Sequence, residues 1–235
     1  MAPEDWQGFP TDFPKITSQI RRPSSESYRW GFYLYRATYN DQLLWERYIA
    51  YIREEASKTL DYEDNRDQLK KHFRLTIIED PSLDEASVEE VQERFRTWVA
   101  ALPEEGDEEQ EIPAFDRRDQ GRFDYCLYVD VECLQSFEIP SETEEEPGET
   151  ESPVSAFVKV INAERHWPDP EEEAYSDEEE DSEEDCEEEQ GPEYYWILLS
   201  CNDICSFYST ITVGCEWDRQ YRLCSYPEKR PWESC

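Results

Sequence analysis

Five short segments of the chain have the apolar pattern of β-strands. Residues 28–39 carry aromatic side chains on both faces, which is typical of a central strand covered on each side. In 123–132, apolar and polar residues alternate, which predicts one buried and one wetter face. The segments 73–77, 154–161 and 194–199 are shorter runs of the same kind. The sequence therefore predicts four to five strands.

Two segments between these strands have the apolar spacing of amphipathic helices. The first stripe follows an N-cap at Asn40 or Asp41, and the second follows Ser82 and Glu85, which have the spacing of a capping box. A third, short helix is predicted over 202–211, capped by Asn202 or Asp203. The two apolar stripes consist of Trp45, Ile49, Ile52, Ala56 and Leu60, and of Val88, Val91, Phe95, Trp98 and Leu102.

This order of elements predicts an α+β fold. Each long helix has one apolar stripe, so each needs one face of a sheet. We expect a two-layer sandwich, in which helices cover mainly one face of a four- to five-stranded sheet. Residues 1–27 are rich in Pro, Ser and acidic residues and predict an extended arm, and 28–235 predict a single domain.

Negative charge is concentrated in three segments that lack Lys and Arg. The formal net charge of the 235 residues is −36, and the segments 104–111, 141–151 and 169–189 hold six, six and fifteen acidic residues. These 27 carboxylates leave a net charge of −9 on the rest, which is ordinary for a soluble domain. Runs of like charge bury nothing, so we expect disordered insertions at 104–111, 141–151 and 169–190.

The charge balance and the amino-terminal sequence exclude several classes of protein. A duplex binder needs cations to displace phosphate counterions, so no direct nucleic-acid binding is expected. The start of the chain lacks the pattern of a signal peptide, and no run of 18 apolar residues occurs, so no membrane contact is expected. We expect a cytoplasmic or nuclear protein whose eight cysteines are free thiols.

Motifs for cofactors, metals and nucleophilic catalysis are absent from the sequence. The glycine-rich loops that hold nucleotides and the nucleophile elbow do not occur, so no cofactor is predicted. Cys201, Cys205, Cys215 and Cys224 lack the close pairing of zinc ligands, so no metal site is predicted. His72 and His166 have no visible partner; we expect a strand-edge residue and a loop residue.

Several short stretches resemble a group of uncharacterised proteins from filamentous fungi (ascomycetes). They are Trp30-Gly31-Phe32, Tyr35-Arg36, Thr38-Tyr39 with Asp41 and Trp45, Arg94-Phe95-Arg96 with Trp98-Val99, and Tyr125-Cys126 with Val129-Asp130. The likeness covers roughly residues 28–165. It implies a fungal source and a similar placing of acidic insertions. No activity is assigned to that group, so the resemblance implies no catalytic residue.

Arg36, Asp130 and Tyr128 are the candidate binding residues. Arg36 lies in an apolar strand, where a cation needs a partner, and Asp130 could be that partner if the first and third strands adjoin. The pair would be either a structural ion pair or part of an anion-binding site. Asp130 and Glu132 are expected as two solvated carboxylates on the wetter face of the third strand, rather than as a catalytic pair.

Two functional hypotheses follow. The first is a non-catalytic interaction protein whose acidic insertions dock a basic macromolecular partner, such as a histone-like or ribosomal protein. Ser176 and Ser182 stand before acidic runs, as acceptor sites of acidophilic kinases do, and phosphate there would add charge. The alternative is an enzyme or small-molecule-binding protein with an aromatic-lined pocket around Arg36. The lack of catalytic motifs favours the first.

Overall fold

A computed structural model of the protein describes residues 13–21, 28–102, 121–138, 156–163, 195–211 and Trp217. The three acidic segments and most of the predicted amino-terminal arm lie outside the described residues, as do His166, Ser176 and Ser182. The elements in chain order are α1 (Pro14–Ile20), β1 (Tyr33–Arg36), α2 (Gln42–Asp61), α3 (Arg66–His72), β2 (Thr76–Ile78), the 3₁₀ helix η2 (Pro81–Leu83), α4 (Val88–Ala101), α5 (Gly121–Asp124), β3 (Tyr125–Val129), α6 (Val131–Glu138), β4 (Phe157–Asn162), β5 (Trp196–Ser200), the 3₁₀ helix η5 (Cys201–Asp203) and α7 (Ile204–Ile211).

The five strands form one mixed sheet in the order β2-β1-β3-β4-β5. β1 pairs in parallel with both β2 and β3, while β4 lies antiparallel to β3 and β5. The central position of β1 explains why apolar and aromatic side chains occupy both of its faces. The prediction of an α+β fold with a four- to five-stranded sheet is confirmed, with five strands.

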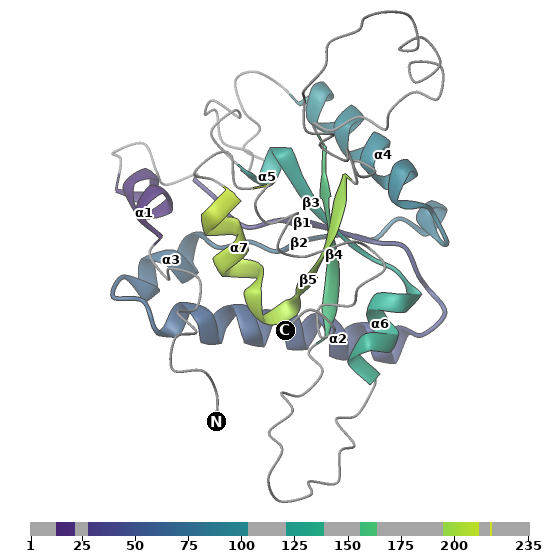
Figure 1. Ribbon diagram of the computed structural model, residues 1–235, viewed down its shortest axis with the longest axis horizontal. Coiled ribbons are helices and arrows are strands. Elements are labelled where there is room, and N and C mark those ends of the chain that lie inside the picture. The colour runs from purple at the N-terminus through teal and green to yellow at the C-terminus, as the bar shows by residue number, and fades with distance from the viewer. Residues whose placement is uncertain are drawn as a thin grey trace, which may run out of the picture.

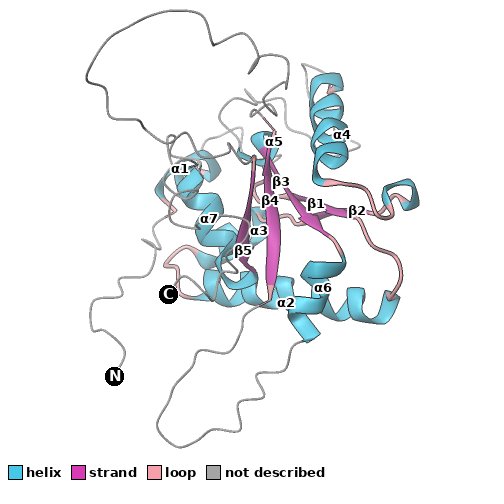
Figure 2. Cartoon of the chain, turned by 45° about the vertical axis from the view of Figure 1, so that its right-hand side comes forward, coloured by secondary structure: helices cyan, strands magenta, loops and turns pink. Residues whose placement is uncertain are grey.

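Helices cover mainly one face of the sheet, and α4 covers the other. Leu34 and Leu127 pack into a large apolar core together with residues of α1, α2, α3, α6 and α7. Tyr33 and Cys126, which neighbour them on the strands, point the other way into a second core that includes Phe95 of α4. Figure 2 shows α4 on the opposite side of the sheet from α1 and α7. The second core therefore adds a smaller third layer to the predicted sandwich.

Two helices lie where the sequence predicted other structure. Residues 14–20 of the predicted extended arm form α1, and Phe13, Ile16 and Ile20 are buried in the large core. Their spacing of three and four residues gives the helix one apolar face. His72, expected at a strand edge, ends α3 instead and is buried. Its Nδ1 lies 2.8 Å from the backbone oxygen of Tyr28.

The third predicted strand, β3, and the second predicted helix, α4, have other bounds than predicted. β3 ends at Val129, and Val131 and Glu132 open α6, so the expected pair of strand carboxylates does not exist. The capping box of α4 is formed by Ser87 and Glu90, because Pro81 starts the separate 3₁₀ turn η2 that contains Ser82. In the described part of the chain, no helix combines the length and apolarity that crossing a bilayer requires.

Candidate functional site

The carboxyl ends of β1 and β2 are the first place to look for a site. The chain leaves β1 towards α2 on one face of the sheet and leaves β2 towards α4 on the other. Where neighbouring parallel strands send their connections to opposite faces, open α/β sheets have their ligand crevices. Arg36 is the last residue of β1, and Glu79 directly follows β2. The geometry therefore brings the predicted binding residue Arg36 to this position.

Arg36 is the centre of a compact polar cluster. Its residue exposure is 2%, and its guanidinium carbon lies 4.2 Å from the ring centroid of Tyr39 and 4.6 Å from that of Trp45. The Nε–H donates to the backbone oxygen of Thr38 at 2.7 Å. Nη1 donates to Gln42 Oε1 at 2.8 Å and to Glu79 Oε1 at 2.9 Å. We call these six residues the Arg36 cluster; they are Arg36, Thr38, Tyr39, Gln42, Trp45 and Glu79.

Asp130 does not pair with Arg36, although β1 and β3 adjoin as the prediction required. Arg36 is in register with Val129, but its carboxylate partner is Glu79. Asp130 instead accepts from Lys159 Nζ at 2.6 Å and from the backbone N–H of Cys133 at 3.0 Å. The chain turns into α6 directly after β3, so the Asp130 carboxylate is needed at the helix start.

Lys159 is a site residue that the sequence prediction missed. It lies directly opposite Tyr128 on β4, and its side chain is 9% exposed. Nζ also reaches Glu132 Oε2 at 2.9 Å and lies 5.1 Å from the ring centroid of Trp196. Lys159, Asp130, Glu132, Tyr128 and Trp196 form what we call the Lys159 cluster. The available signal was a single cation inside the apolar run 154–161.

The Lys159 cluster holds its amine in the charged form. Burial alone would lower the pKa of Lys159, but the hydrogen bond and the negative charge of Asp130 outweigh burial and raise it above the ordinary value. An amine that keeps its proton cannot act as a nucleophile or a general base. The Tyr128 hydroxyl donates to the backbone oxygen of Ala86 at 2.8 Å. Asp130 and Tyr128 therefore serve the packing of this cluster rather than a pocket.

The loop between β2 and α4 packs against the end of β1. The backbone N–H of Glu85 donates to the Ala37 oxygen at 3.0 Å, and the backbone N–H of Tyr39 donates to Asp84 Oδ1 at 3.1 Å. Glu85 has a φ of 60°, a left-handed conformation that is uncommon for a residue with a side chain. The loop thus leaves the Arg36 cluster exposed only through Gln42, Glu79 and Tyr39.

Two surface hollows of the described chain lie away from both clusters. One lies on the outer side of α4, and the other lies between α2, α3 and the start of β2. The second is lined by three cations and by apolar side chains. Its lining residues are Arg53, Ser57, Leu60, Lys70, Phe73, Arg74 and Leu75. Neither hollow includes Arg36, Asp130 or Tyr128.

The described thiols are buried and protonated. Cys126, Cys133, Cys201 and Cys205 are free, and burial raises the pKa of each thiol, that of Cys201 to about 12. A thiol in this state is a poor nucleophile. Within the described residues, no group of three or more His, Cys, Asp or Glu side chains could hold a metal ion. Cys215 and Cys224 lie outside the described residues.

The chain matches no protein-family model, no curated protein and no solved structure. The resemblance to fungal proteins stays a prediction.

Proposed function

We propose that the protein is a non-catalytic interaction protein that docks a basic macromolecular partner through its acidic insertions. One observation carries the proposal. The described residues that flank the first and third insertions lie at the same end of the sheet. The partner class would be a histone-like or ribosomal protein, met in the cytoplasm or nucleus of a fungal cell.

Two of the three insertions are anchored at the same end of the sheet. The first lies between Leu102 and Gly121, and the third lies between Ala163 and Tyr195. The backbone N–H of Ala163 donates to the Asp124 oxygen at 2.8 Å, and that of Asn162 donates to the Tyr195 oxygen at 2.7 Å. The rings of Trp98 and Phe123 lie 6.4 Å apart, which brings the last turn of α4 to the same place. Figure 1 shows α5 and the end of α4 together at the upper end of the sheet.

The second insertion is anchored at the opposite end. It lies between Glu138 and Ala156, and the backbone N–H of Phe157 donates to Ser136 Oγ at 3.1 Å. Phe157 and Asn162 are the two ends of β4, about 17 Å apart at about 3.4 Å per residue. This distance is about twice the Debye length of about 8 Å at physiological salt, so charges held near the two ends would be screened from each other.

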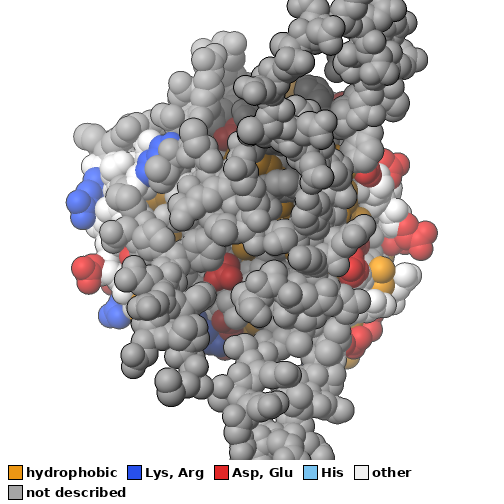
Figure 3. All heavy atoms as spheres, viewed as in Figure 1, with side chains coloured by type: hydrophobic (Ala, Val, Ile, Leu, Met, Phe, Trp, Pro, Cys, Tyr) orange, Lys and Arg blue, Asp and Glu red, His pale blue; other side chains and the backbone are white. Residues whose placement is uncertain are grey.

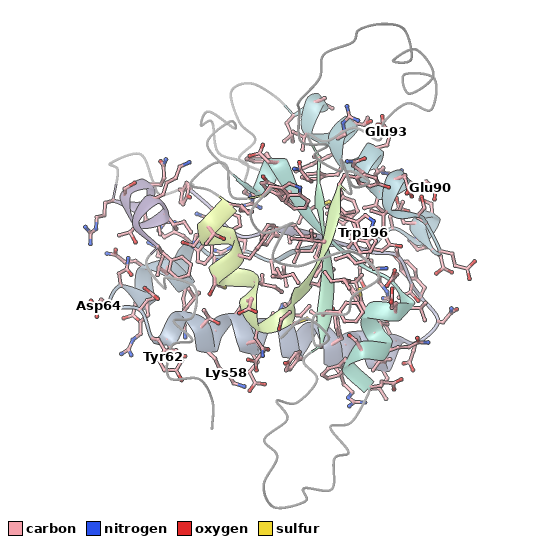
Figure 4. All side chains as sticks on the ribbon, viewed as in Figure 1. Lys58, Tyr62, Asp64, Glu90, Glu93 and Trp196 are labelled. Carbon is pink, nitrogen blue, oxygen red and sulfur yellow. The ribbon has the colours of Figure 1, made fainter. Side chains whose placement is uncertain are left out.

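The described residues that flank 104–111 and 169–189, the segments with 21 of the 27 segment carboxylates, therefore lie at one end of the sheet. Neighbouring like charges add their potentials and attract a cationic chain at long range. The described surface of α4 carries the acidic residues Glu89, Glu90 and Glu93 together with Arg94 and Arg96. Figure 3 shows acidic side chains along the side where α4 lies, and in Figure 4 Glu90 and Glu93 point from α4 away from the sheet. Phosphate on Ser176 or Ser182 would strengthen the same attraction.

The chain offers a matched test, because 104–111 and 141–151 each hold six carboxylates but are anchored at opposite ends. We expect neutralisation of the six in 104–111 by Glu→Gln and Asp→Asn to weaken binding of a 20-residue oligolysine and of core histones about tenfold or more, at roughly 0.3 kcal/mol for each exposed pair. Neutralising the six in 141–151 should weaken it less than about threefold, since screening separates that segment from the binding end.

Fluorescence anisotropy at physiological salt measures both affinities, and circular dichroism checks that each variant is folded. Neutralising the fifteen carboxylates of 169–189 should give the largest loss. Equal losses for the two six-residue variants would mean that only total charge matters and would contradict a docking end. Undiminished binding after neutralisation of 169–189 would contradict docking itself.

A further inference from the structure

Half of the Arg36 guanidinium fork has no acceptor. Glu79 and Gln42 both accept from Nη1, while Nη2 is buried and has no hydrogen-bond partner. The Arg36 side chain is 3% exposed, so bulk water does not supply one. A buried donor on a charged group is costly to leave unpaired. A planar carboxylate commonly takes two N–H groups of a guanidinium at once, and Glu79 takes only one here.

A second unused donor belongs to the same cluster. The Tyr39 hydroxyl is buried and its proton has no acceptor, and its ring stacks on the Arg36 guanidinium. Burial raises the pKa of Tyr39 and outweighs the opposite effect of Arg36, so the phenol keeps its proton. The backbone N–H of Asp80, which also interacts with this oxygen, can only donate. Both donors of the Arg36 cluster, Nη2 and the phenol, therefore lack an acceptor.

The residues around the Arg36 guanidinium favour the binding of a small anion, and two of them are exposed to solvent. The 20-residue helix α2 begins at Gln42, and its first turn contains no acidic residue beyond the Asp41 cap, so the positive end of its dipole lies beside Arg36. The Glu79 side chain is 49% exposed and Gln42 is exposed. A ligand can thus reach the guanidinium by displacing one surface side chain, while the backbone of β1 and the loop after β2 stay in place.

We propose that Arg36 binds the carboxylate of a small organic acid, which displaces Glu79. The ligand carboxylate accepts from Nη1 and Nη2 together, and the Tyr39 hydroxyl donates to the same group. A carboxylate is favoured over a phosphate, because it is planar like the guanidinium and because a second negative charge would be repelled by Glu79 and Asp80. The site is independent of the acidic insertions, so the two proposals can fail separately.

The test titrates full-length ¹⁵N-labelled protein with sodium acetate at constant ionic strength and follows the Nε–Hε signal of Arg36. We expect a saturable shift, and about tenfold tighter binding in Glu79→Gln, which removes the internal competitor. Tyr39→Phe should weaken binding about tenfold and lower the melting temperature only slightly, because in the free protein the hydroxyl accepts from the Asp80 N–H but donates to no group. Glu93→Gln is the matched control; it removes the same charge from an exposed side chain of α4 and should leave affinity unchanged.

Three results would overturn the proposal. The absence of a saturable shift in Glu79→Gln would mean that a water molecule alone occupies the position. If inorganic phosphate bound more tightly than acetate at Arg36, the proposed ligand class, a carboxylate, would be wrong. An equal gain in acetate affinity in Glu93→Gln and Glu79→Gln would mean that only the net charge of the protein changes the affinity. Because none of these variants touches 104–111, 141–151 or 169–189, the result is separate from the docking experiment.

Discussion

Replacing Asp130 with alanine is expected to lower the free energy of unfolding by about 3 kcal/mol, the lower end of the range for removing one partner of a buried ion pair, because Lys159 keeps Glu132 as a partner. Asp130 is 17% exposed at its side chain, and Lys159 is 9% exposed, so little water can compensate. The same change removes the acceptor for the Cys133 N–H at the start of α6. Urea denaturation followed by circular dichroism measures the loss.

Two further variants separate the buried charge from the other effects. Glu132→Ala should cost about 1 kcal/mol or less, because that carboxylate is 52% exposed. Lys159→Met should cost less than Asp130→Ala, because an apolar side chain of similar length leaves no buried cation behind. If Asp130→Ala were no worse than Glu132→Ala, the Lys159 cluster would contribute only as a surface ion pair.

The pH dependence of the same variants checks the assignment. The pKa of Lys159 is raised in the folded protein above the ordinary 10.5, so its contribution is complete below pH 10.5 and is lost as pH rises through the folded pKa. The stability difference between the natural protein and Asp130→Ala should therefore shrink as pH rises above 10.5. Besides burial, Asp130 also raises the pKa of Tyr48, Tyr128 and Cys133, so these groups act in the same direction at high pH. A difference that is constant with pH would exclude Lys159 as the group involved.

The main elements of the fold follow from local patterns. The stripe from Trp45 to Leu60 predicts α2, and α2 begins at the residue after the predicted cap Asp41. The capping box was placed five residues early because the same pattern occurs twice, at Ser82 and at Ser87. Choosing between them requires knowing that Pro81 starts a separate turn and that the loop after it packs against the end of β1.

The short helices were not predicted, because a helical period can be recognised only over a sufficient number of residues. α6 has eight residues, and the alternation of β3 continues by chance into its first two, so the turn at Asp130 carries no periodic signal. In α1 the spacing of Phe13, Ile16 and Ile20 was a signal, but the surrounding Pro and Ser residues concealed it. Charge density and Pro content identify exposed chain only when no apolar stripe accompanies them.

The sequence identified Arg36 as a site residue but did not identify its partner. A cation inside an apolar strand must have partners, which identifies Arg36 from the sequence alone. Its actual partner, Glu79, lies 43 residues away and comes near only because β2 pairs with β1 in parallel. Asp130 was an equally reasonable partner until the sheet order and the start of α6 were known.

Gly31→Ala is expected to lower the free energy of unfolding by roughly 2–4 kcal/mol, from backbone strain together with a steric clash. Gly31 has a φ of 105°, which residues with a Cβ rarely adopt. A Cβ built there would lie 2.5 Å from the Arg74 oxygen and 2.9 Å from Phe73 Cε2. The backbone cannot retreat, because the Arg74 N–H donates to the Trp30 oxygen at 2.8 Å and the Trp30 N–H donates to the His72 oxygen at 3.1 Å.

Gly31→Asn distinguishes the two causes, and urea denaturation again measures the cost. Asparagine tolerates positive φ better than alanine but carries the same Cβ. If the clash with Arg74 dominates, Gly31→Asn should be at least as destabilising as Gly31→Ala; if strain in φ dominates, asparagine should restore part of the stability. Near-natural stability of both variants would mean that the bridge between Trp30 and Phe73 is not held as closely as its hydrogen bonds indicate. Because that bridge brings the start of β1 against the end of α3, we expect the destabilised variant also to expose His72 and the Trp30 ring to solvent, which tryptophan fluorescence would detect.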